Sequence, residues 1–318
     1  MQTVLVAGGA GFIGSHLCKK LLDENFSVIC VDNLLTSDKK NIESFLTNPN
    51  FIFLEQDITS SPLTITNGQI DFIFHLASPA SPNINSPRSY MSYPIETLQV
   101  NSLGTKNLLD LALDHHAKFL FASTSEVYGD PAVSPQPETY FGNVNPNGIR
   151  SVYDEGKRFG EALSMAYYRK YGLDIRIIRI FNTYGPNMLA DDGRVVSNFI
   201  VAALQNKPLA IYGDGSQTRS FCYVSDLIEG IFSAMFSNNT KAAVINIGNP
   251  LEKTIKEFAM LIKDLTKTSS ELTYEVLPED DPKQRKPDIT IAKQLLNWEP
   301  KISLEEGLQK TIDYFKNV

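Results

Sequence analysis

The sequence predicts an α/β protein with a doubly wound parallel sheet and a smaller C-terminal lobe. Two observations predict the sheet. A short apolar strand at the start of the chain leads through a glycine-rich turn into a helical pattern, and β-branched apolar runs then alternate with helical patterns up to residue 181. The lobe is predicted by a third observation, which is that the elements expected beyond residue 182 are shorter.

The first half of the chain carries the elements of the sheet. Apolar strands are expected at 3–7, 27–31, 51–54, 71–76, 118–123 and 174–180. Helical patterns are clearest at 12–23, 95–113 and 152–170. Strands that alternate with helices in this way pair in parallel, and right-handed crossovers are the default connection between them.

The second half predicts a lobe whose segments are not contiguous. Helices are expected at 195–206, 224–236, 254–266 and 303–316, and short strands near 209–212, 243–247 and 273–276. We therefore expect a main domain at 1–181, joined by part of 221–249, and a substrate-binding lobe formed mainly by 182–318.

The turn after the first strand is typical of a dinucleotide site. Gly8 and Gly11 stand between the strand and a helix that begins with Phe12, Ile13 and Gly14. Glycines at this spacing allow a tight turn, close approach of a pyrophosphate to the backbone, and close packing of helix on strand. The N–H groups of the helix N-terminus attract phosphate. The pattern predicts a Rossmann-type domain with these five residues at the cofactor.

The second strand ends at Asp32, eighteen residues after Gly14. A carboxylate at this position can accept hydrogen bonds from ribose hydroxyls and would repel a 2′-phosphate, so the sequence predicts NAD rather than NADP. The alternative is that Asp32 serves only to form a local turn.

A tyrosine and a lysine predict the oxidation of a carbinol. Tyr153 and Lys157 stand four residues apart in a helical pattern, which places both on one face. A nearby cation lowers the pKa of a tyrosine from about 10, so the pair could take a proton from a sugar hydroxyl. The strand at 118–123 leads into Thr124, whose hydroxyl could hold the same carbinol. The alternatives are a solvated helix pair and an ordinary strand-end turn.

A proline-rich segment at 77–94 follows the fourth strand. It contains four prolines, and ligands of open α/β sheets bind beyond the carboxyl ends of the strands. We expect this segment to form a lid or a wall of the substrate site, and the alternative is a flexible surface loop.

Composition narrows the class of protein. The 318 residues carry a net charge of −7, which argues against a nucleic-acid or anionic-membrane partner. Cys18, Cys30 and Cys222 are odd in number and far apart, as expected for reduced thiols in the cytoplasm. The four histidines show no metal-ligand spacing, so no metal is expected. No apolar run reaches the roughly 18 residues of a membrane helix, and the first strand starts too early for a signal peptide.

These motifs resemble the UDP-glucuronate decarboxylase branch of the extended short-chain dehydrogenase/reductase family. The segments that carry the resemblance are 75–82, 122–131, 145–146, 153–158, 179–186, 192–200, 215–221 and 281–288. The resemblance implies bound NAD and UDP-glucuronate as substrate. It further implies three steps, in which C4 of the sugar is oxidised, the C5 carboxylate leaves as CO2, and the hydride returns to C4.

The resemblance also implies roles for particular residues. Tyr153 would be the base for the C4 hydroxyl, assisted by Lys157 and Thr124, and Glu126 and Arg285 would serve the decarboxylation. The further cofactor positions are Asn33, Asp57, Ile58 and Leu76. The further substrate positions are Pro79, Tyr90, Ser125, Arg150, Asn182, Arg194, Val195, Asn198, Tyr212 and Arg219. From composition alone, Arg285 would instead lie in a solvated charged loop.

The chain departs from the family pattern at three places. Residues 83–93 are a few positions longer than the short form of this loop, which leaves the roles of Tyr90 and Tyr93 open. Phe141 stands where a tryptophan is common, and Asn187 stands where an arginine is common. Neither of the last two belongs to the expected catalytic set.

Two other readings remain beside the decarboxylase. A nucleotide-sugar 4-epimerase or 4,6-dehydratase would share the fold, but a dehydratase would carry an Asp–Glu pair in place of Ser125 and Glu126, and an epimerase needs neither Glu126 nor Arg285. A non-catalytic NAD-sensing protein would lack the tyrosine, the lysine or the threonine, and all three are present. The resemblance also implies a homodimer through the helices near 95–113 and 152–170.

Overall fold

A seven-stranded parallel sheet forms the main part of the protein. The computed structural model describes residues 1–60, 65, 68–277 and 284–318. The strand order is β11-β6-β5-β4-β1-β2-β3, and every neighbouring pair is parallel. The strands are β1 Thr3–Ala7, β2 Ser27–Asp32, β3 Phe51–Glu55, β4 Phe72–His75, β5 Lys118–Thr124, β6 Ile175–Ile180 and β11 Val244–Ile247. The six strands predicted in the first half are confirmed to within one residue at each end.

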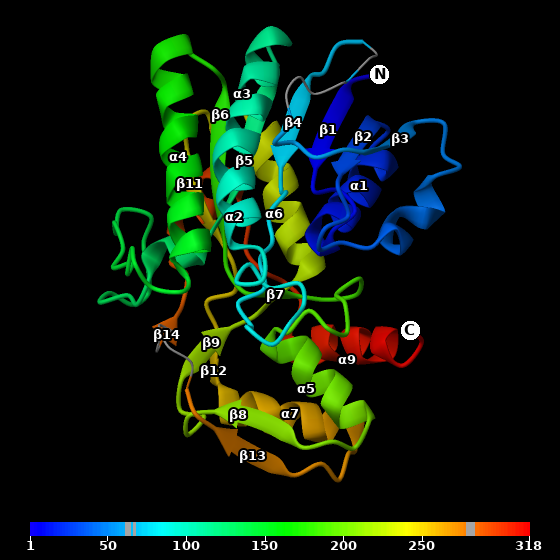
Figure 1. Cartoon of the computed structure of the whole chain (residues 1–318), viewed down its shortest axis with the longest axis vertical. Helices are drawn as coiled ribbons and strands as arrows, with labels where there is room; N and C mark the ends of the chain where they lie inside the picture. The colour runs from blue at the N-terminus through cyan, green and yellow to red at the C-terminus, as the bar shows by residue number, and fades with distance from the viewer. Residues whose placement is uncertain (61–64, 66–67, 278–283) are drawn as a thin grey trace.

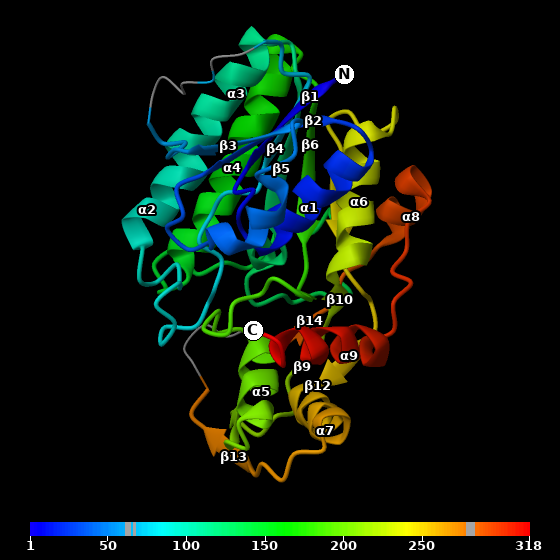
Figure 2. The same cartoon turned by 90° about the vertical axis from the view of Figure 1, so that its right-hand side faces the viewer.

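Helices cover both faces of the sheet, so the predicted doubly wound arrangement is confirmed (Figure 1, Figure 2). One face carries α2 Pro94–Gln99, α3 Thr105–Asp114 and α4 Ser151–Tyr171, and the other carries α1 Phe12–Asp23 and α6 Val224–Phe236. Successive side chains of β1 point to opposite faces. Leu5 therefore packs in one core with Leu108 of α3, and Val4 packs in the other core with Leu17 of α1.

The helix predicted at 95–113 is interrupted by one π-helical turn, η2 Val100–Gly104. Thr105 Oγ1 donates a hydrogen bond to the Asn101 carbonyl at 2.8 Å and lies 3.0 Å from Nε2 of the buried His75. Gly104 lets the helix approach Ile58, because a Cβ at Gly104 would lie 2.9 Å from Ile58 Cδ1. The interruption thus seats the helix against the loop that follows β3. Apolar periodicity does not report such a local change of pitch.

The lobe lies beyond the carboxyl ends of the strands (Figure 1). Three short sheets tie it together, with strand orders β12-β9-β14, β13-β8 and β10-β7. Its strands are β7 Thr183–Tyr184, β8 Leu209–Tyr212, β9 Thr218–Ser220, β10 Cys222–Tyr223, β12 Glu252–Thr254, β13 Leu272–Glu275 and β14 Gln284–Arg285. The remaining helices are α5 Val195–Leu204, α7 Ile255–Thr266, α8 Thr290–Leu296 and α9 Leu304–Phe315, together with the 3₁₀ turns η1 Lys39–Phe45 and η3 Ser125–Tyr128.

The starts of the lobe helices follow from their capping residues. Thr254 and Glu257 form a reciprocal capping box at the start of α7, and Ser303 accepts from the Glu306 N–H at the start of α9. Both helices were predicted at these positions. Within the part of the chain that the structure describes, no helix is both long and apolar enough to cross a membrane.

Candidate active site

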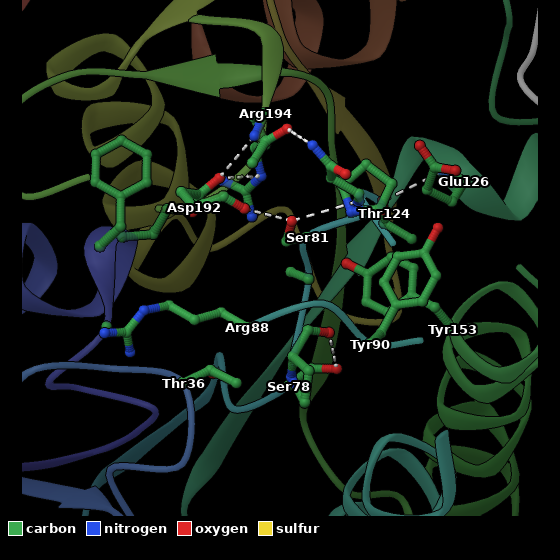
Figure 3. A pocket seen from close by; sticks show the side chains of 18 of the residues that line it. Thr36, Ser78, Ser81, Arg88, Tyr90, Thr124, Glu126, Tyr153, Asp192 and Arg194 are labelled. Carbon is green, nitrogen blue, oxygen red and sulfur yellow. Dashed lines mark hydrogen bonds and ion pairs between the residues drawn. The ribbon is translucent and has the colours of Figure 1, made fainter. Parts of the chain in front are cut away.

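A cavity of about 700 Å³ opens between the carboxyl edge of the sheet and the lobe (Figure 3). Its lining includes Gly8 after β1, Asp32 at the end of β2, Ser78 after β4, Thr124 at the end of β5 and Asn182 after β6. Parallel strands all end at this edge of the sheet, so residues far apart in the sequence meet there. The volume is in the range of about 300–1,000 Å³ that is typical of ligand sites.

The cavity brings together the residues that the sequence singled out. The predicted residues that line it are Gly8, Gly11, Phe12, Ile13, Gly14, Asp32, Asn33, Asp57, Ile58, Leu76, Pro79, Tyr90, Thr124, Ser125, Glu126, Arg150, Tyr153, Lys157, Asn182, Arg194, Val195, Asn198, Tyr212 and Arg219. Arg285 is the exception, because its side chain lies outside this lining and behind Glu126.

The glycine turn has the geometry of a phosphate cradle. Gly8 adopts a φ of +81°, and a Cβ there would lie 2.6 Å from the Ala77 nitrogen. Gly11 is the N-cap of α1, and no acidic residue stands in the first helical turn. The N–H groups at this end of the helix can therefore donate hydrogen bonds to a bound anion. The turn fits a dinucleotide, as the sequence predicted.

Asp32 serves the turn and also faces the cavity. Its Oδ1 accepts from the Leu34 N–H at 2.9 Å and from Ser37 Oγ at 2.7 Å, and its Oδ2 accepts from the Ala10 N–H at 3.0 Å. The local turn considered as an alternative is therefore present, and it holds the carboxylate at the wall of the cavity, while the contact with ribose stays a prediction. Burial raises the pKa of Asp32, although these hydrogen bonds act in the opposite direction.

Tyr153 and Lys157 lie on one face of α4 and are both buried. Lys157 Nζ donates to the Ala122 carbonyl at 2.9 Å and lies 5.8 Å from the centroid of the Tyr153 ring. The net shift of the Tyr153 pKa is upward, whereas the sequence predicted a shift toward working pH. Burial raises the pKa of Tyr153 to about 12 despite a hydrogen bond with Thr124, and burial lowers the pKa of Lys157 to about 7. For both side chains the largest cause is the cost of burying the charged form.

Tyr90 fixes the orientation of the Tyr153 ring. The two rings are stacked with 4.9 Å between centroids and 2° between planes, and both side chains appear in Figure 3. The Tyr90 hydroxyl is buried and has no hydrogen-bond partner among the residues that the structure describes. An aromatic pair in this geometry contributes about 0.5–1.5 kcal/mol beyond burial. Tyr93, in contrast, is the N-cap of α2 and does not line the cavity.

A carboxylate held by two arginines lies at the same end of the cavity. Arg150 Nη2 donates to Glu126 Oε2, and Arg285 Nη2 lies 3.8 Å from the same oxygen. Arg285 also donates to the carbonyls of Ser125 and Gly129 and is only 2% exposed. The solvated position that composition favoured for Arg285 is therefore wrong. Burial alone would raise the pKa of Glu126, but the two guanidinium groups hold it well below its usual range.

Asp154 is a buried acid that the sequence did not single out. It follows Tyr153 in α4, is 6% exposed, and its Oδ1 has no hydrogen-bond partner among the described residues. Burial, reinforced by the charge of Glu126, raises its pKa to about 8. Its place next to the Tyr–Lys pair was visible in the sequence, but its burial depends on tertiary packing at the site, where Glu126, Arg150 and Arg285 act on its pKa.

Asp154→Asn should flatten the pH dependence of stability. The unfolded carboxyl ionises near its ordinary pKa of 3.8, whereas the folded carboxyl keeps its proton up to about pH 8. Folding therefore takes up a proton between about pH 4 and pH 8, and this group's contribution is lost as the pH rises through that window. Urea unfolding at pH 5 and pH 8 measures the change. Equal losses of stability in the parent and the variant would contradict the prediction.

The lobe supplies polar residues to the opposite wall of the cavity. Asn198 Nδ2 donates to the Gly193 carbonyl at 2.9 Å, and Arg194 Nε lies 3.4 Å from Asp192 Oδ1. Asn182 Nδ2 is buried without a hydrogen-bond partner among the described residues. A ligand in the cavity would supply the partner that buried polar groups normally have. Arg219 lies on β9, whose partner β14 carries Arg285.

A glycine cradle at the end of β1, a carboxylate at the end of β2 and a Tyr–Lys pair facing a threonine define a dinucleotide-dependent enzyme of the short-chain dehydrogenase type. The sequence matches the NAD dependent epimerase/dehydratase family over residues 4–248, and the chain belongs to that family.

Among its relatives, UDP-glucuronic acid decarboxylases match over nearly the whole chain. Identity is 50% to UDP-glucuronic acid decarboxylase 1 of Xenopus tropicalis, with 99% of this chain and 72% of that protein covered. It is 51% to UDP-glucuronic acid decarboxylase 3 of Arabidopsis thaliana, with 96% and 86% covered. The solved structure of UDP-glucuronic acid 4-epimerase from Bacillus cereus with UDP-glucuronic acid and NAD is 31% identical, with a TM-score of 0.89 and 99% of both chains covered.

Proposed function

We propose that this protein decarboxylates UDP-glucuronate to UDP-xylose with NAD as a bound cofactor. The observation that carries the proposal is the Glu126 carboxylate held by Arg150 and Arg285 beside the buried Tyr153. An enzyme that only oxidises and reduces a carbinol does not need this cluster. The decarboxylases that match nearly the full length of the chain support the same activity.

The first step is the oxidation of the C4 hydroxyl. NAD, when bound, accepts the hydride from C4 and returns it at the end of the cycle. Tyr153 takes the hydroxyl proton, and Thr124, which hydrogen-bonds to the Tyr153 hydroxyl, holds the same oxygen. Lys157 is anchored on the Ala122 carbonyl, and in its protonated form it partly offsets the cost that burial imposes on the Tyr153 phenolate.

The second step is the loss of CO2. With a ketone at C4, the electrons of the bond between C5 and its carboxylate flow into the carbonyl and leave an enolate. Arg150 lines the cavity and can hold the carboxylate, while Glu126 fixes the position of Arg150. Arg285 lies behind Glu126 and acts through it. C5 then takes up one proton from water, the hydride returns to C4, and Tyr153 gives its proton back to the C4 oxygen, which completes the cycle.

The remaining site residues receive roles from their places around the cavity. We assign Asp32, Asn33, Asp57, Ile58 and Leu76 to the adenosine half of NAD, because they follow the ends of β2, β3 and β4. The UDP group is assigned to residues of the lobe and its border, namely Asn182, Arg194, Val195, Asn198, Tyr212 and Arg219. We likewise assign residues 1–181 with part of 221–249 to cofactor binding and the rest mainly to substrate binding.

Incubation of the protein with UDP-glucuronate, followed by identification of the products, tests the proposed function. We expect UDP-xylose and CO2 in equal amounts, without net consumption of NAD. Recovery of a UDP-sugar that keeps its carboxylate would reject decarboxylation. The second candidate is a 4-epimerase, because the chain is similar to the Bacillus cereus enzyme. The 4-epimer of UDP-glucuronate among the products would favour this candidate.

We also propose a homodimer through the helices α2, α3 and α4. Large apolar side chains are exposed on α2, on the π-helical turn η2 between α2 and α3, and on α4. Ile95 is 60% exposed, Leu103 is 50% exposed and Phe159 is 51% exposed. Exposed apolar groups clustered on neighbouring helices indicate an interface.

Three free cysteines and a net charge of −7 support a cytoplasmic protein without a nucleic-acid partner.

The double variant Leu103→Lys with Phe159→Glu should be a monomer. Charged groups buried at an interface without a designed partner oppose association by several kcal/mol. Light scattering after size-exclusion chromatography measures the mass. Leu251→Lys is the matched control, because Leu251 is 75% exposed and lies outside these helices. A parent protein that is already monomeric, or a double variant that stays dimeric, would reject this interface.

A further inference from the structure

Part of the loop between β4 and α2 crosses from the main sheet to the lobe. Ser86 Oγ donates to the Asp191 carbonyl at 2.6 Å, and Asn83 Nδ2 donates to the Gly193 carbonyl at 3.0 Å. Gly193 has a φ of +87°, and a Cβ there would lie 2.8 Å from the Cβ atoms of both Asn83 and Ser86. Residues 83–88, here named the strap, are thus packed directly on the turn before α5.

The strap presents one arginine to the cavity. Arg88 Nε donates to Asp191 Oδ1 at 2.9 Å, and the Arg88 side chain is 28% exposed. Its Nη1 and Nη2 make no hydrogen bond with any other residue that the structure describes. Asp191 therefore anchors one edge of the guanidinium group and leaves the outer edge to bind an anion.

The exposed edge of Arg88 faces the cofactor half of the cavity. Arg88 lines the same cavity as Thr36 and Ser78, and Figure 3 shows its side chain extending away from the Tyr90–Tyr153 pair. Thr36 belongs to the loop that follows β2 and Asp32, where the adenosine half of a dinucleotide is expected.

The other lysine and arginine side chains in the described lining either contact another group of the site or belong to the lobe. Arg150 pairs with Glu126, and Lys157 bonds to the Ala122 carbonyl. Arg194 and Arg219 belong to the lobe. A dinucleotide carries two negative charges on its diphosphate, and the glycine turn at residues 8–14 offers them backbone N–H groups but contains no lysine or arginine. Arg88 is therefore the side chain placed to supply a full positive charge on this side.

We propose that Arg88 binds the diphosphate of the bound dinucleotide and that Asp191 orients it for this contact. The strap then closes over the cofactor and fastens it to the turn that carries Arg194. The proposal concerns retention of the cofactor and does not depend on which sugar reaction the enzyme performs. The same guanidinium chemistry would suit the diphosphate of a UDP-sugar, so the test separates the two nucleotides.

Calorimetric titration of nucleotide-free protein with NAD, ADP-ribose and UDP tests the proposal. Arg88→Met keeps the apolar stem and removes the charge, and it should weaken NAD and ADP-ribose about 10–100-fold, since a charge-assisted hydrogen bond is lost. UDP should bind as it does to the parent. Asp191→Asn should show a smaller loss for NAD, because the guanidinium group keeps its charge but loses its anchor.

Arg169→Met is the matched control, because Arg169 is an exposed arginine in the last turn of α4. It should leave all three dissociation constants unchanged. Unchanged binding of NAD to Arg88→Met would overturn the proposal. A loss for UDP equal to or larger than the loss for NAD would assign Arg88 to the sugar nucleotide and would overturn it as well.

Discussion

Tyr153→Phe should lower kcat by about 10²–10⁴-fold, the usual effect of removing a well-placed acid–base group. The variant keeps the ring that stacks on Tyr90 and loses only the hydroxyl that hydrogen-bonds to Thr124. The C4 proton then has no acceptor, so oxidation fails before CO2 can leave. Both the absorbance of reduced nicotinamide in a single turnover and the release of CO2 should fall together.

Tyr167→Phe provides the control for this prediction. Tyr167 stands on the same helix and its hydroxyl donates to Asp110 Oδ1 at 2.5 Å, but it does not line the cavity. Its loss should reduce stability slightly and leave kcat unchanged. If Tyr153→Phe still formed reduced nicotinamide at the parent rate, another group would have to be the base.

The sheet could be predicted because its strands are local patterns. Each apolar run of four to seven residues between turn signals marks a strand, and these strands formed as expected. The π-helical turn at Val100–Gly104 could not be read in this way, since it depends on contacts with β4 and with Ile58. The strand β11 was expected, but it pairs with β6, which lies 64 or more residues earlier in the chain. That pairing depends on tertiary packing and not on a local pattern.

The site was predicted in part for the same reason. Gly8, Asp32 and the Tyr–Lys pair sit in fixed relation to a strand or helix, so spacing alone predicts where they meet. Arg285 does not, because its burial is compensated by long-range contacts with Glu126 and with the carbonyls of Ser125 and Gly129. The pKa of Tyr153 was predicted in the wrong direction because spacing gives the position of a cation but not the depth of burial. Packing decides that depth.

Glu126→Gln should separate decarboxylation from hydride transfer. The amide keeps the shape of the side chain but removes the charge that orders Arg150 and Arg285. The C4 oxidation depends on Tyr153, Lys157 and Thr124, which keep their contacts. We therefore expect CO2 release to slow by about 10²–10⁴-fold while the first hydride transfer changes little. Reduced nicotinamide should then accumulate in a single turnover, together with a UDP-sugar that bears a C4 ketone.

Asp174→Asn is the matched control, because it also removes a carboxylate that pairs with a buried arginine. Asp174 Oδ1 lies 3.0 Å from Nη1 of Arg176, at the amino end of β6 and away from the cavity. Both variants leave an arginine uncompensated, so both should unfold more easily. Only Glu126→Gln should change the ratio of hydride transfer to CO2 release. If CO2 left at the parent rate, the cluster would be structural, and the ketone alone would account for the reaction.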